Sequence, residues 1–330
     1  MTSEDRQNGG AVLVTGANGH LGTRLVNRLS ATRQVIAAVR SPGAAQHLTE
    51  YLTGQGGNLD RVQIEVISYT DVAALNTLIA DCSAIVHLVG IIKESPTGSY
   101  FDAHEATTQA LLDALAVGSS NRDPDQTVSL CYLSIVGAHP TSSNACLASK
   151  GRAEQMLLDS GYSTAVLQLP MVLGEGDYAA QAINQQAAKG LNFVFAKNAR
   201  DQPIYAGDVL SAIIALLPTT AEPAASSDSA ANARIVLAGP ESVTKAQLIT
   251  RAAAFSGRSS VVIGLPLFFA QAFTQLISRV SSNPPITPAM LEILHHDDNF
   301  DVAGTCDQLG LTLTGLDEML AKVATAQRAP

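Results

Sequence analysis

Short apolar runs alternate with segments of helical periodicity through the first half of the chain. The run AVLVT at 11–15 ends in a Gly-Ala-Asn-Gly turn, after which Leu21, Leu25, Val26 and Leu29 follow at helical spacing. Further strands are predicted at 34–39, 62–66, 84–89, 128–133 and 164–169, with helices from 71, over 101–117 and over 148–160. Because strands that alternate with helices form βαβ units, we expect an α/β protein with a doubly wound parallel sheet.

The pattern changes after Pro170, where helices and shorter strands follow one another less regularly. Helices are predicted at 178–189, 208–217 and 244–255, and strands at 192–195 and 234–237. We therefore divide the chain into a first domain over 1–170 and a smaller C-terminal α/β lobe over 171–330, with parts of 204–240 returning to the sheet of the first domain. The Ala-, Ser-, Thr- and Pro-rich stretch at 218–233 has no periodicity and is expected to be a surface insertion.

Residues 268–280 show a clean amphipathic pattern, with apolar side chains on one helical face and Gln271, Gln275 and Ser278 on the other. We expect this helix to lie on the core of the C-terminal lobe. The alternative is a helix that contacts a partner or a membrane surface, although Arg279 supplies its only basic charge. No run of about 18 apolar residues occurs, so a transmembrane helix is not expected.

Composition narrows the classes of function. The chain has 330 residues, of which 46% are hydrophobic and 15% charged, so it is long and apolar enough for a sizeable core. A net charge of −9 disfavours nucleic acid as a partner. Its four cysteines have no CxxC pair and no metal-ligand spacing with histidine, which predicts no metal site and a reducing compartment. The polar first ten residues do not resemble a secretory signal, so we expect a cytoplasmic protein.

The turn after the first strand carries the strongest functional signal. A pyrophosphate needs close backbone approach and a helix N-terminus, and glycine meets both requirements. The glycines lie between a strand and a helix inside a βαβ unit, which favours a dinucleotide site over a turn with no ligand. The predicted contacts are Thr15, Gly16, Asn18, Gly19, His20, Leu21 and Gly22.

The end of the second strand predicts which dinucleotide binds. In NAD-binding sites a carboxylate here accepts hydrogen bonds from the ribose hydroxyls. This chain has no carboxylate between Val35 and Ser41 and offers Arg40 instead, whose guanidinium can pair with the 2′-phosphate of NADP. We therefore favour NADP(H) over NAD(H). The alternative is that Arg40 is an ordinary solvated surface charge.

The spacing TGxxGxxG resembles the short-chain dehydrogenase/reductase superfamily, whose nucleotide-binding domain is a Rossmann fold. The motifs VTGANGHLG, AIVHLVGI, CYLSIVGA, SKGRAEQML, LQLPMVLGEGD and PIYAGDV follow the order of its atypical, extended-type members. Within that group, VHLVGII at 86–92 and PITPAMLEILHHDDN within 284–299 resemble proteins related to the nucleotide-binding accessory subunit of respiratory complex I. The resemblance implies an NADPH-binding Rossmann core under a C-terminal lobe, with the nucleotide held structurally.

The resemblance also implies further cofactor contacts. The backbone of Leu88, Val89 and Gly90 would pass under the nicotinamide ribose, and Lys150 would hold that ribose. Ser68 takes the place of an aspartate that contacts adenine in many relatives, and Pro170 would follow the sixth strand beside the nicotinamide. His87, inside the apolar strand, is expected to be a hydrogen-bonded core histidine rather than a catalyst.

In active members of the superfamily, a serine, a tyrosine and a lysine four residues later exchange a proton with a carbonyl or alcohol. Ser134 and Lys150 match this set, but Cys146 stands at the tyrosine position. A thiol is shorter than a phenol and would not hold the substrate oxygen in the same way. Tyr132 or His139 as proton donor, or Cys146 as nucleophile, are the conceivable substitutes. A purely structural Tyr132 is favoured.

Three functions follow from these residues. The favoured one is an NADP(H)-binding protein that is non-catalytic or weakly catalytic and serves in assembly, stability or redox sensing of a partner complex. The alternative is an NADP-dependent oxidoreductase or nucleotide-sugar epimerase with a non-tyrosine proton donor, which Ser134 and Lys150 support. A quinone- or lipid-linked reductase with peripheral membrane contact is the third, and only the segment at 268–280 suggests it.

Overall fold

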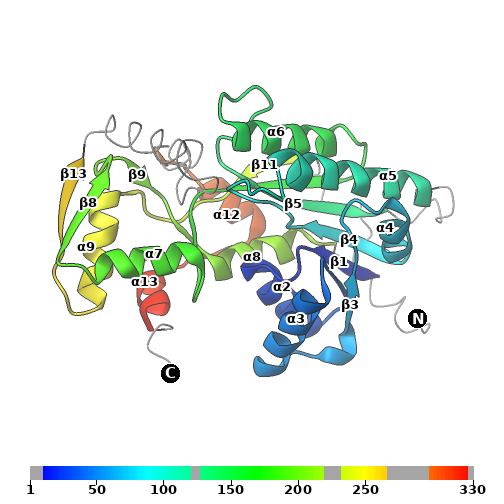
Figure 1. Cartoon of the computed structure of the whole chain (residues 1–330), viewed down its shortest axis with the longest axis horizontal. Coiled ribbons are helices and arrows are strands. Elements are labelled where there is room, and N and C mark those ends of the chain that lie inside the picture. The colour runs from blue at the N-terminus through cyan, green and yellow to red at the C-terminus, as the bar shows by residue number, and fades with distance from the viewer. Residues whose placement is uncertain (1–9, 120–126, 219–231, 266–296, 326–330) are drawn as a thin grey trace. The chain divides into compact units, whose positions relative to one another are not determined.

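The computed structural model describes residues 10–119, 127–218, 232–265 and 297–325 (Figure 1). The chain forms two compact units. Unit 1 comprises Met1–Ile92, Gly98–Gln168 and Leu210–Ile235, and unit 2 comprises Lys93–Thr97, Leu169–Val209 and Val236–Pro330. The predicted surface insertion lies almost wholly outside the described residues, and the predicted amphipathic helix at 268–280 lies entirely outside them.

Unit 1 is built on a seven-stranded sheet with the order β11-β6-β5-β4-β1-β2-β3. The strands are β1 (Ala11–Thr15), β2 (Val35–Val39), β3 (Val62–Val66), β4 (Cys82–His87), β5 (Ser129–Ile135), β6 (Thr164–Leu169) and β11 (Ala233–Val236). The pairs from β3 through β2, β1 and β4 to β5 are parallel, which confirms the predicted fold class. The order reverses beside β1, so a crevice for a ligand is expected at the carboxyl ends of β1 and β4.

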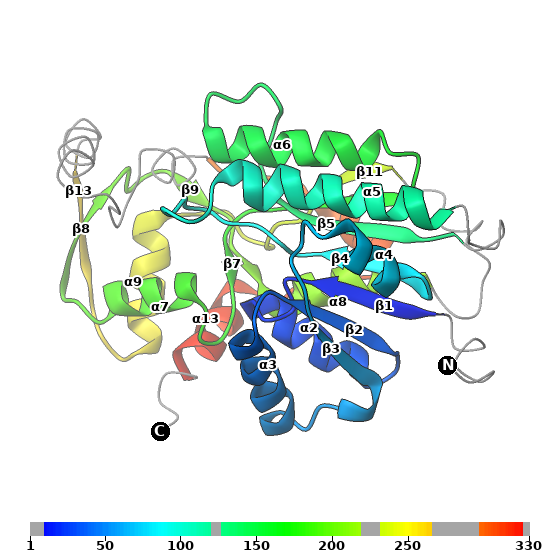
Figure 2. The same cartoon turned by 45° about the vertical axis from the view of Figure 1, so that its right-hand side comes forward.

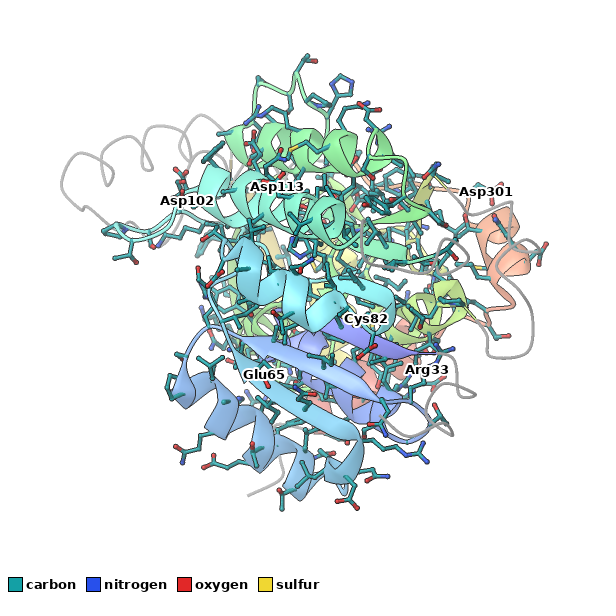
Figure 3. All side chains as sticks on the ribbon, turned by 90° about the vertical axis from the view of Figure 1, so that its right-hand side faces the viewer. Arg33, Glu65, Cys82, Asp102, Asp113 and Asp301 are labelled. Carbon is teal, nitrogen blue, oxygen red and sulfur yellow. The ribbon has the colours of Figure 1, made fainter. Side chains whose placement is uncertain are left out.

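Helices cover both faces of this sheet, and β1 near its centre is accordingly buried at all its positions. The helices are α2 (His20–Ser30), α3 (Pro42–Gly54), α4 (Val72–Ile79), α5 (Thr107–Ser119) and α6 (Ala145–Leu158). Figures 1 and 2 show α4, α5 and α6 on one face and α2 and α3 on the other. A view from the side places α5, marked by Asp113, on the other side of the sheet from α3, with Cys82 of β4 and Glu65 of β3 between them (Figure 3).

Two helix starts differ from the sequence-based expectation. The helix predicted from 148 begins at Ala145, because the Asn144 side chain accepts hydrogen bonds from the N–H groups of Cys146 and Leu147 and caps it. The helix predicted from 101 begins with a π-helical segment, η2 (Phe101–Ala106), before α5. Both differences matter for function, since they fix how Cys146 and the side chains of η2 face the ends of β4 and β5.

Unit 2 has short strands around a helical core. Its strands are β7 (Val172–Leu173), β8 (Leu191–Phe195), β9 (Arg200–Asp201), β10 (Ile204–Tyr205), β12 (Val243–Thr244) and β13 (Val261–Leu265). Its helices are α7 (Tyr178–Ala187), α9 (Lys245–Phe255), α12 (Ala303–Leu309) and α13 (Leu316–Thr325), and α8 (Ala206–Leu216) leads back into unit 1. Leu248, Met319 and Leu320 are among its core residues. A capping box formed by Thr244 and Gln247 begins α9. Among the described residues, no helix is long and apolar enough to cross a membrane.

Candidate nucleotide-binding site

The glycine turn after β1 lies against the backbone at the end of β4. Gly16 has a φ of +72°, and a Cβ there would lie 3.1 Å from the carbonyl carbon of Leu88. A Cβ on Gly22 would lie 2.4 Å from the carbonyl oxygen of Gly16, so α2 packs directly on the turn. Larger side chains at these two positions would therefore displace the backbone, as expected for a turn shaped to let a ligand approach closely.

Helix α2 begins at this turn without a side-chain cap. Gly19 is its N-cap, whereas Ser41, Asp71 and Asn144 each cap the helix that follows them through a side-chain oxygen. The N–H groups in the first turn of α2 are thus left to bind an anion, and the helix dipole favours negative charge there. Asn18 and Leu21 are half-buried, and Gly19 and His20 are exposed.

Thr15 directs its side chain into the protein rather than toward the turn. Its Oγ1 lies 2.7 Å from Nδ1 of His87, and Nε2 of His87 lies 3.3 Å from Oγ1 of Thr107. Because Thr107 Oγ1 donates to the carbonyl oxygen of Ala103, it accepts from His87, which is then the neutral Nε2–H tautomer. Burial lowers the pKa of His87 to about 3. His87 is therefore the hydrogen-bonded core histidine that its strand position predicted.

The residues predicted to bind adenosine lie at the ends of β2 and β3. Arg40 is exposed directly after β2, and α3 starts two residues later with no acidic residue in its first turn. Ser68 is exposed, and its Oγ lies 3.0 Å from Oγ1 of Thr70. The next residue, Tyr69, is buried and was missed by the sequence reasoning: its hydroxyl accepts a hydrogen bond from the N–H of Gly16 at 3.0 Å.

Lys150 reaches from α6 to the ends of β4 and β5. Its Nζ donates to the carbonyl oxygen of Leu133 at 2.8 Å and lies 4.5 Å from the centre of the Tyr132 ring. It also lies 2.9 Å from where a Cβ on Gly90 would be, so glycine at that position leaves room for the ammonium. Burial lowers the pKa of Lys150 to about 8.

Cys146 lies one helical turn before Lys150 and is fully buried. Its Sγ donates to the carbonyl oxygen of Ile91 at 3.7 Å. Ser134, in β5, is 5% exposed, and its Oγ has no hydrogen-bond partner within the described part of the chain. The structure thus directs the side chains of Cys146 and Lys150 toward the chain after β4 and the end of β5, and leaves the Ser134 hydroxyl unengaged.

Tyr132 belongs to the main hydrophobic core and is completely buried. Its ring stacks on His87, with ring centres 5.6 Å apart, and burial raises the pKa of its phenol well above the usual range. This placement favours the structural role over proton donation. His139, the other possible donor, is exposed, and its Nδ1 lies 2.9 Å from Oγ1 of Thr141.

His104, on η2, is a second residue that the sequence reasoning missed. It is fully buried, and its Nε2 lies 3.1 Å from the nitrogen and 3.0 Å from the oxygen of Ile91. Burial and the charge of Lys150 lower its pKa to about 3, so it is neutral. His104 therefore holds the backbone segment that also receives the Cys146 thiol. Nothing in the sequence around 104 distinguishes it from other polar residues of that helix.

The remaining predicted residue, Pro170, is half-buried directly after β6, where the chain enters unit 2.

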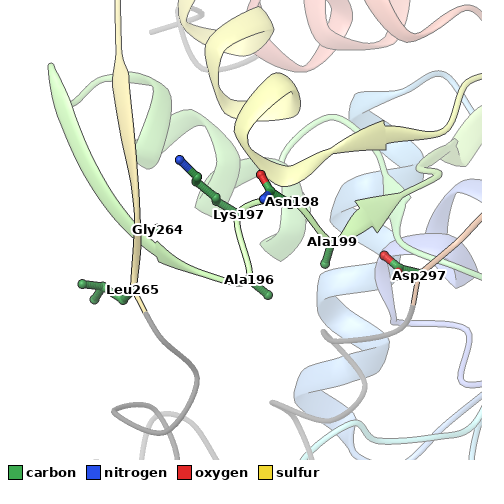
Figure 4. A pocket seen from close by; sticks show the side chains of 7 residues that line it. All are labelled: Ala196, Lys197, Asn198, Ala199, Gly264, Leu265 and Asp297. Carbon is green, nitrogen blue, oxygen red and sulfur yellow. The ribbon is translucent and has the colours of Figure 1, made fainter.

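A separate open hollow of about 510 Å³ lies in unit 2 (Figure 4). Its lining residues are Ala196, Lys197, Asn198, Ala199, Gly264, Leu265 and Asp297. None of the predicted site residues lines it. The described residues contain no cluster of side chains suited to a metal ion.

Comparison with known proteins agrees with the geometry of the turn. The family model for the NAD-dependent epimerase/dehydratase family matches residues 12–227. The chain belongs to this family. At the sequence level no curated relative matches it. The match begins at β1 and covers the glycine turn, Arg40, Cys146 and Lys150, so nicotinamide dinucleotide binding is a property of the family to which these residues belong.

Solved structures of several other proteins share the fold. UDP-N-acetylglucosamine 4-epimerase from Bacillus cereus has a TM-score of 0.66 at 17% identity, with 97% of this chain and 100% of that chain covered. UDP-glucuronic acid 4-epimerase from Bacillus cereus, in complex with UDP-glucuronic acid and NAD, has a TM-score of 0.68 at 17% identity, covering 96% and 99%. The Bordetella bronchiseptica enzyme WbmF, in complex with NAD+, has a TM-score of 0.66 at 16% identity, covering 98% and 94%.

Proposed function

We propose that this member of the epimerase/dehydratase family binds NADP(H) and holds it with little or no turnover, in a structural, assembly or redox-sensing role. The observation that carries the proposal is the position of Cys146. Where active relatives of the superfamily have a tyrosine, this chain has a fully buried thiol that donates to the carbonyl oxygen of Ile91. The resemblance of residues 86–92 and 284–299 to the complex I accessory-subunit group supports a role beside a partner protein.

The chemistry of the thiol supports binding without turnover. A tyrosine gives active relatives a long, rigid hydroxyl that reaches the substrate oxygen and exchanges a proton with it. The Cys146 side chain is several atoms shorter, and its sulfur is directed at a backbone carbonyl inside the protein. A ligand oxygen would have to enter a completely buried position to meet it. The proton exchange that completes hydride transfer in the superfamily therefore has no tyrosine to perform it here.

Lys150 retains a role in binding. Its ammonium lies beside Gly90, where the resemblance places the nicotinamide ribose, and the Leu133 carbonyl already accepts one of its three protons. Two N–H groups remain for ribose hydroxyls. Bound nucleotide would supply a hydride donor or acceptor, whereas Lys150 orients the ribose.

Arg40 supports the preference for NADP(H). Its exposed guanidinium stands between the end of β2 and the N-terminus of α3, with no carboxylate between Val35 and Ser41. A 2′-phosphate placed there would meet a positive side chain and the positive end of a helix dipole. A ribose carrying a free 2′-hydroxyl would find no acidic acceptor.

The preference is tested by titrating the purified chain with NADPH and NADH, following nucleotide fluorescence. We expect tighter binding of NADPH, and Arg40→Ala should weaken NADPH about 10- to 100-fold while leaving NADH unchanged. Arg61→Ala, which removes a cation from the segment before β3, is the matched control. Equal affinity of the unsubstituted chain for both nucleotides, or an Arg40→Ala variant that keeps the preference, would contradict the assignment.

A second candidate is an oxidoreductase or nucleotide-sugar epimerase with a non-tyrosine proton donor. The buried, unpartnered hydroxyl of Ser134 and the lowered pKa of Lys150, about 8, favour it, because both leave a polar group available for a substrate oxygen. The UDP-sugar 4-epimerases of similar fold suggest the substrate class. Incubation with NAD+ and UDP-sugars, followed by separation of the 4-epimers, tests it; product whose formation Ser134→Ala abolishes would establish this candidate.

A further inference from the structure

The phenol of Tyr69 joins the carboxyl ends of three neighbouring strands. Tyr69 follows β3 and is 5% exposed. Its hydroxyl accepts the hydrogen bond from the N–H of Gly16, in the turn after β1, and donates to the carbonyl oxygen of Ala38, in β2, at 2.9 Å. One oxygen atom therefore links the glycine turn to β2, the strand that Arg40 directly follows.

The carbonyl oxygen of Ala38 also accepts a hydrogen bond directly from the glycine turn. The N–H of Ala17 donates to the Ala38 oxygen at 3.3 Å, so two successive amides of the turn are connected to β2, one directly and one through the phenol. With its left-handed φ, Gly16 depends on such bonds to fix the orientation of its peptide groups. Without the phenol, the Gly16 amide would lose its acceptor.

Arg40 lies close to the hydrogen bonds that Tyr69 makes. It lies two residues beyond Ala38, and its positive charge acts on the Tyr69 phenol, opposing the rise in pKa that burial causes. The Tyr69 hydroxyl thus adds to the pairing of β1 and β2 a further bond between the proposed pyrophosphate cradle and the strand that leads to the proposed 2′-phosphate partner. Ser68, which the sequence suggested for this region, is exposed, and its hydroxyl bonds to Thr70 in its own loop.

We propose that Tyr69 is a positioning residue that sets the pyrophosphate cradle relative to Arg40, so that both ends of the adenosine diphosphate half of the dinucleotide are recognised together. The proposal rests on the proposed function, since it takes the turn and Arg40 as ligand contacts. On this proposal Tyr69, a residue outside the glycine motif, contributes to nucleotide affinity.

The test compares Tyr69→Phe, which removes only the hydroxyl, with Tyr162→Phe, a substitution at the opposite end of the sheet. NADPH, NADH, ADP-ribose and adenosine 2′-monophosphate are titrated against each variant. Tyr69→Phe should weaken the three ligands that carry a pyrophosphate about five- to tenfold and change adenosine 2′-monophosphate by less than about twofold. Tyr162→Phe should change none of them.

The outcomes separate this inference from the proposed function. Equal loss for all four ligands would show a general effect on the fold and overturn the inference, as would unchanged affinity for the pyrophosphate ligands. If the unsubstituted chain prefers NADH, the NADP(H) assignment fails, yet NADH and ADP-ribose still test Tyr69. If it binds no dinucleotide, both fail. Amide hydrogen exchange of the unsubstituted, ligand-free chain is the independent measurement: the Gly16 amide should be protected, and rapid exchange there would also overturn the inference.

Discussion

Two regions of unit 1 lie at the carboxyl edge of the same sheet and differ in how their polar groups are hydrogen-bonded. The turn between β1 and α2 has close-packed glycines, an uncapped helix N-terminus and exposed residues around it. The region where β4, β5 and α6 meet has Lys150 and Ser134 but a buried Cys146, and its polar groups bond mainly to the protein itself. The first region leaves backbone N–H groups for an anion, whereas in the second the Cys146 thiol and one N–H of Lys150 bond to backbone carbonyl oxygens.

Under the proposed function, the requirements of binding and of proton transfer are separable in this fold. Binding needs backbone geometry, which the glycines and the strand order provide. Proton transfer needs a side chain of suitable length and acidity at the position that Cys146 occupies. On this proposal the chain keeps the fold of its family without the superfamily's usual proton transfer.

The largest effect is expected from Gly22→Ala. Its Cβ would lie 2.4 Å from the Gly16 oxygen, so the turn must shift and dinucleotide affinity should fall by more than about 100-fold. Overpacking should also lower the free energy of unfolding by about 1–3 kcal/mol, measured by urea denaturation. Gly54→Ala, where an added Cβ meets nothing within 4 Å, is the control. A Gly22→Ala variant that binds NADPH normally would remove the distinction between the two regions.

A smaller effect is expected on the pH dependence of the unfolding free energy, through the charge of Lys150. Burial lowers its pKa in the folded chain to about 8, from an ordinary lysine value of 10.5. Between these values the unfolded chain binds more protons, so the stability contributed by this group rises with pH. Relative to Lys150→Met, the unsubstituted, ligand-free chain should gain about 2 kcal/mol of unfolding free energy from about pH 7.5 to about pH 10.

Urea denaturation at both pH values measures this gain. Lys322→Met, at a partly exposed lysine of α13, serves as the control for general effects of pH and of lost charge. Parallel stability profiles of the unsubstituted chain and Lys150→Met would show that Lys150 is not desolvated as described, and the second region would then be more open than the structure indicates.

The smallest effect is expected from Cys146→Ser. If the thiol only fills space and bonds to Ile91, a hydroxyl can replace it, and NADPH affinity should change by less than about twofold. The same titration on Cys306→Ser, in α12, controls for loss of a thiol elsewhere. A tenfold or larger loss confined to Cys146→Ser would give the cysteine a direct part in the site.

Local features of this molecule could be predicted from the sequence, and long-range ones could not. The βαβ order and the glycine turn follow from periodicity and spacing within a few residues. Cys146 could be recognised because it lies four residues before Lys150. The hydrogen bond between Gly16 and Tyr69 joins residues 53 positions apart in the sequence. His104 lies in the π-helical segment η2 and bonds to the backbone of Ile91. No pattern in the sequence reveals either contact. Burial of Cys146 and Tyr132 likewise depends on how α6 packs on β5, which periodicity alone does not specify.

Under the proposed function, the site holds its nucleotide without consuming it. The direct measurement is to load the unsubstituted chain with one equivalent of NADPH and follow the absorbance of the bound nucleotide while carbonyl compounds and quinones are added in excess. We predict stoichiometric binding and no oxidation beyond the rate of free NADPH. Repeated turnover of NADPH with any of these acceptors would contradict the account and show that a group other than the missing tyrosine completes the reaction.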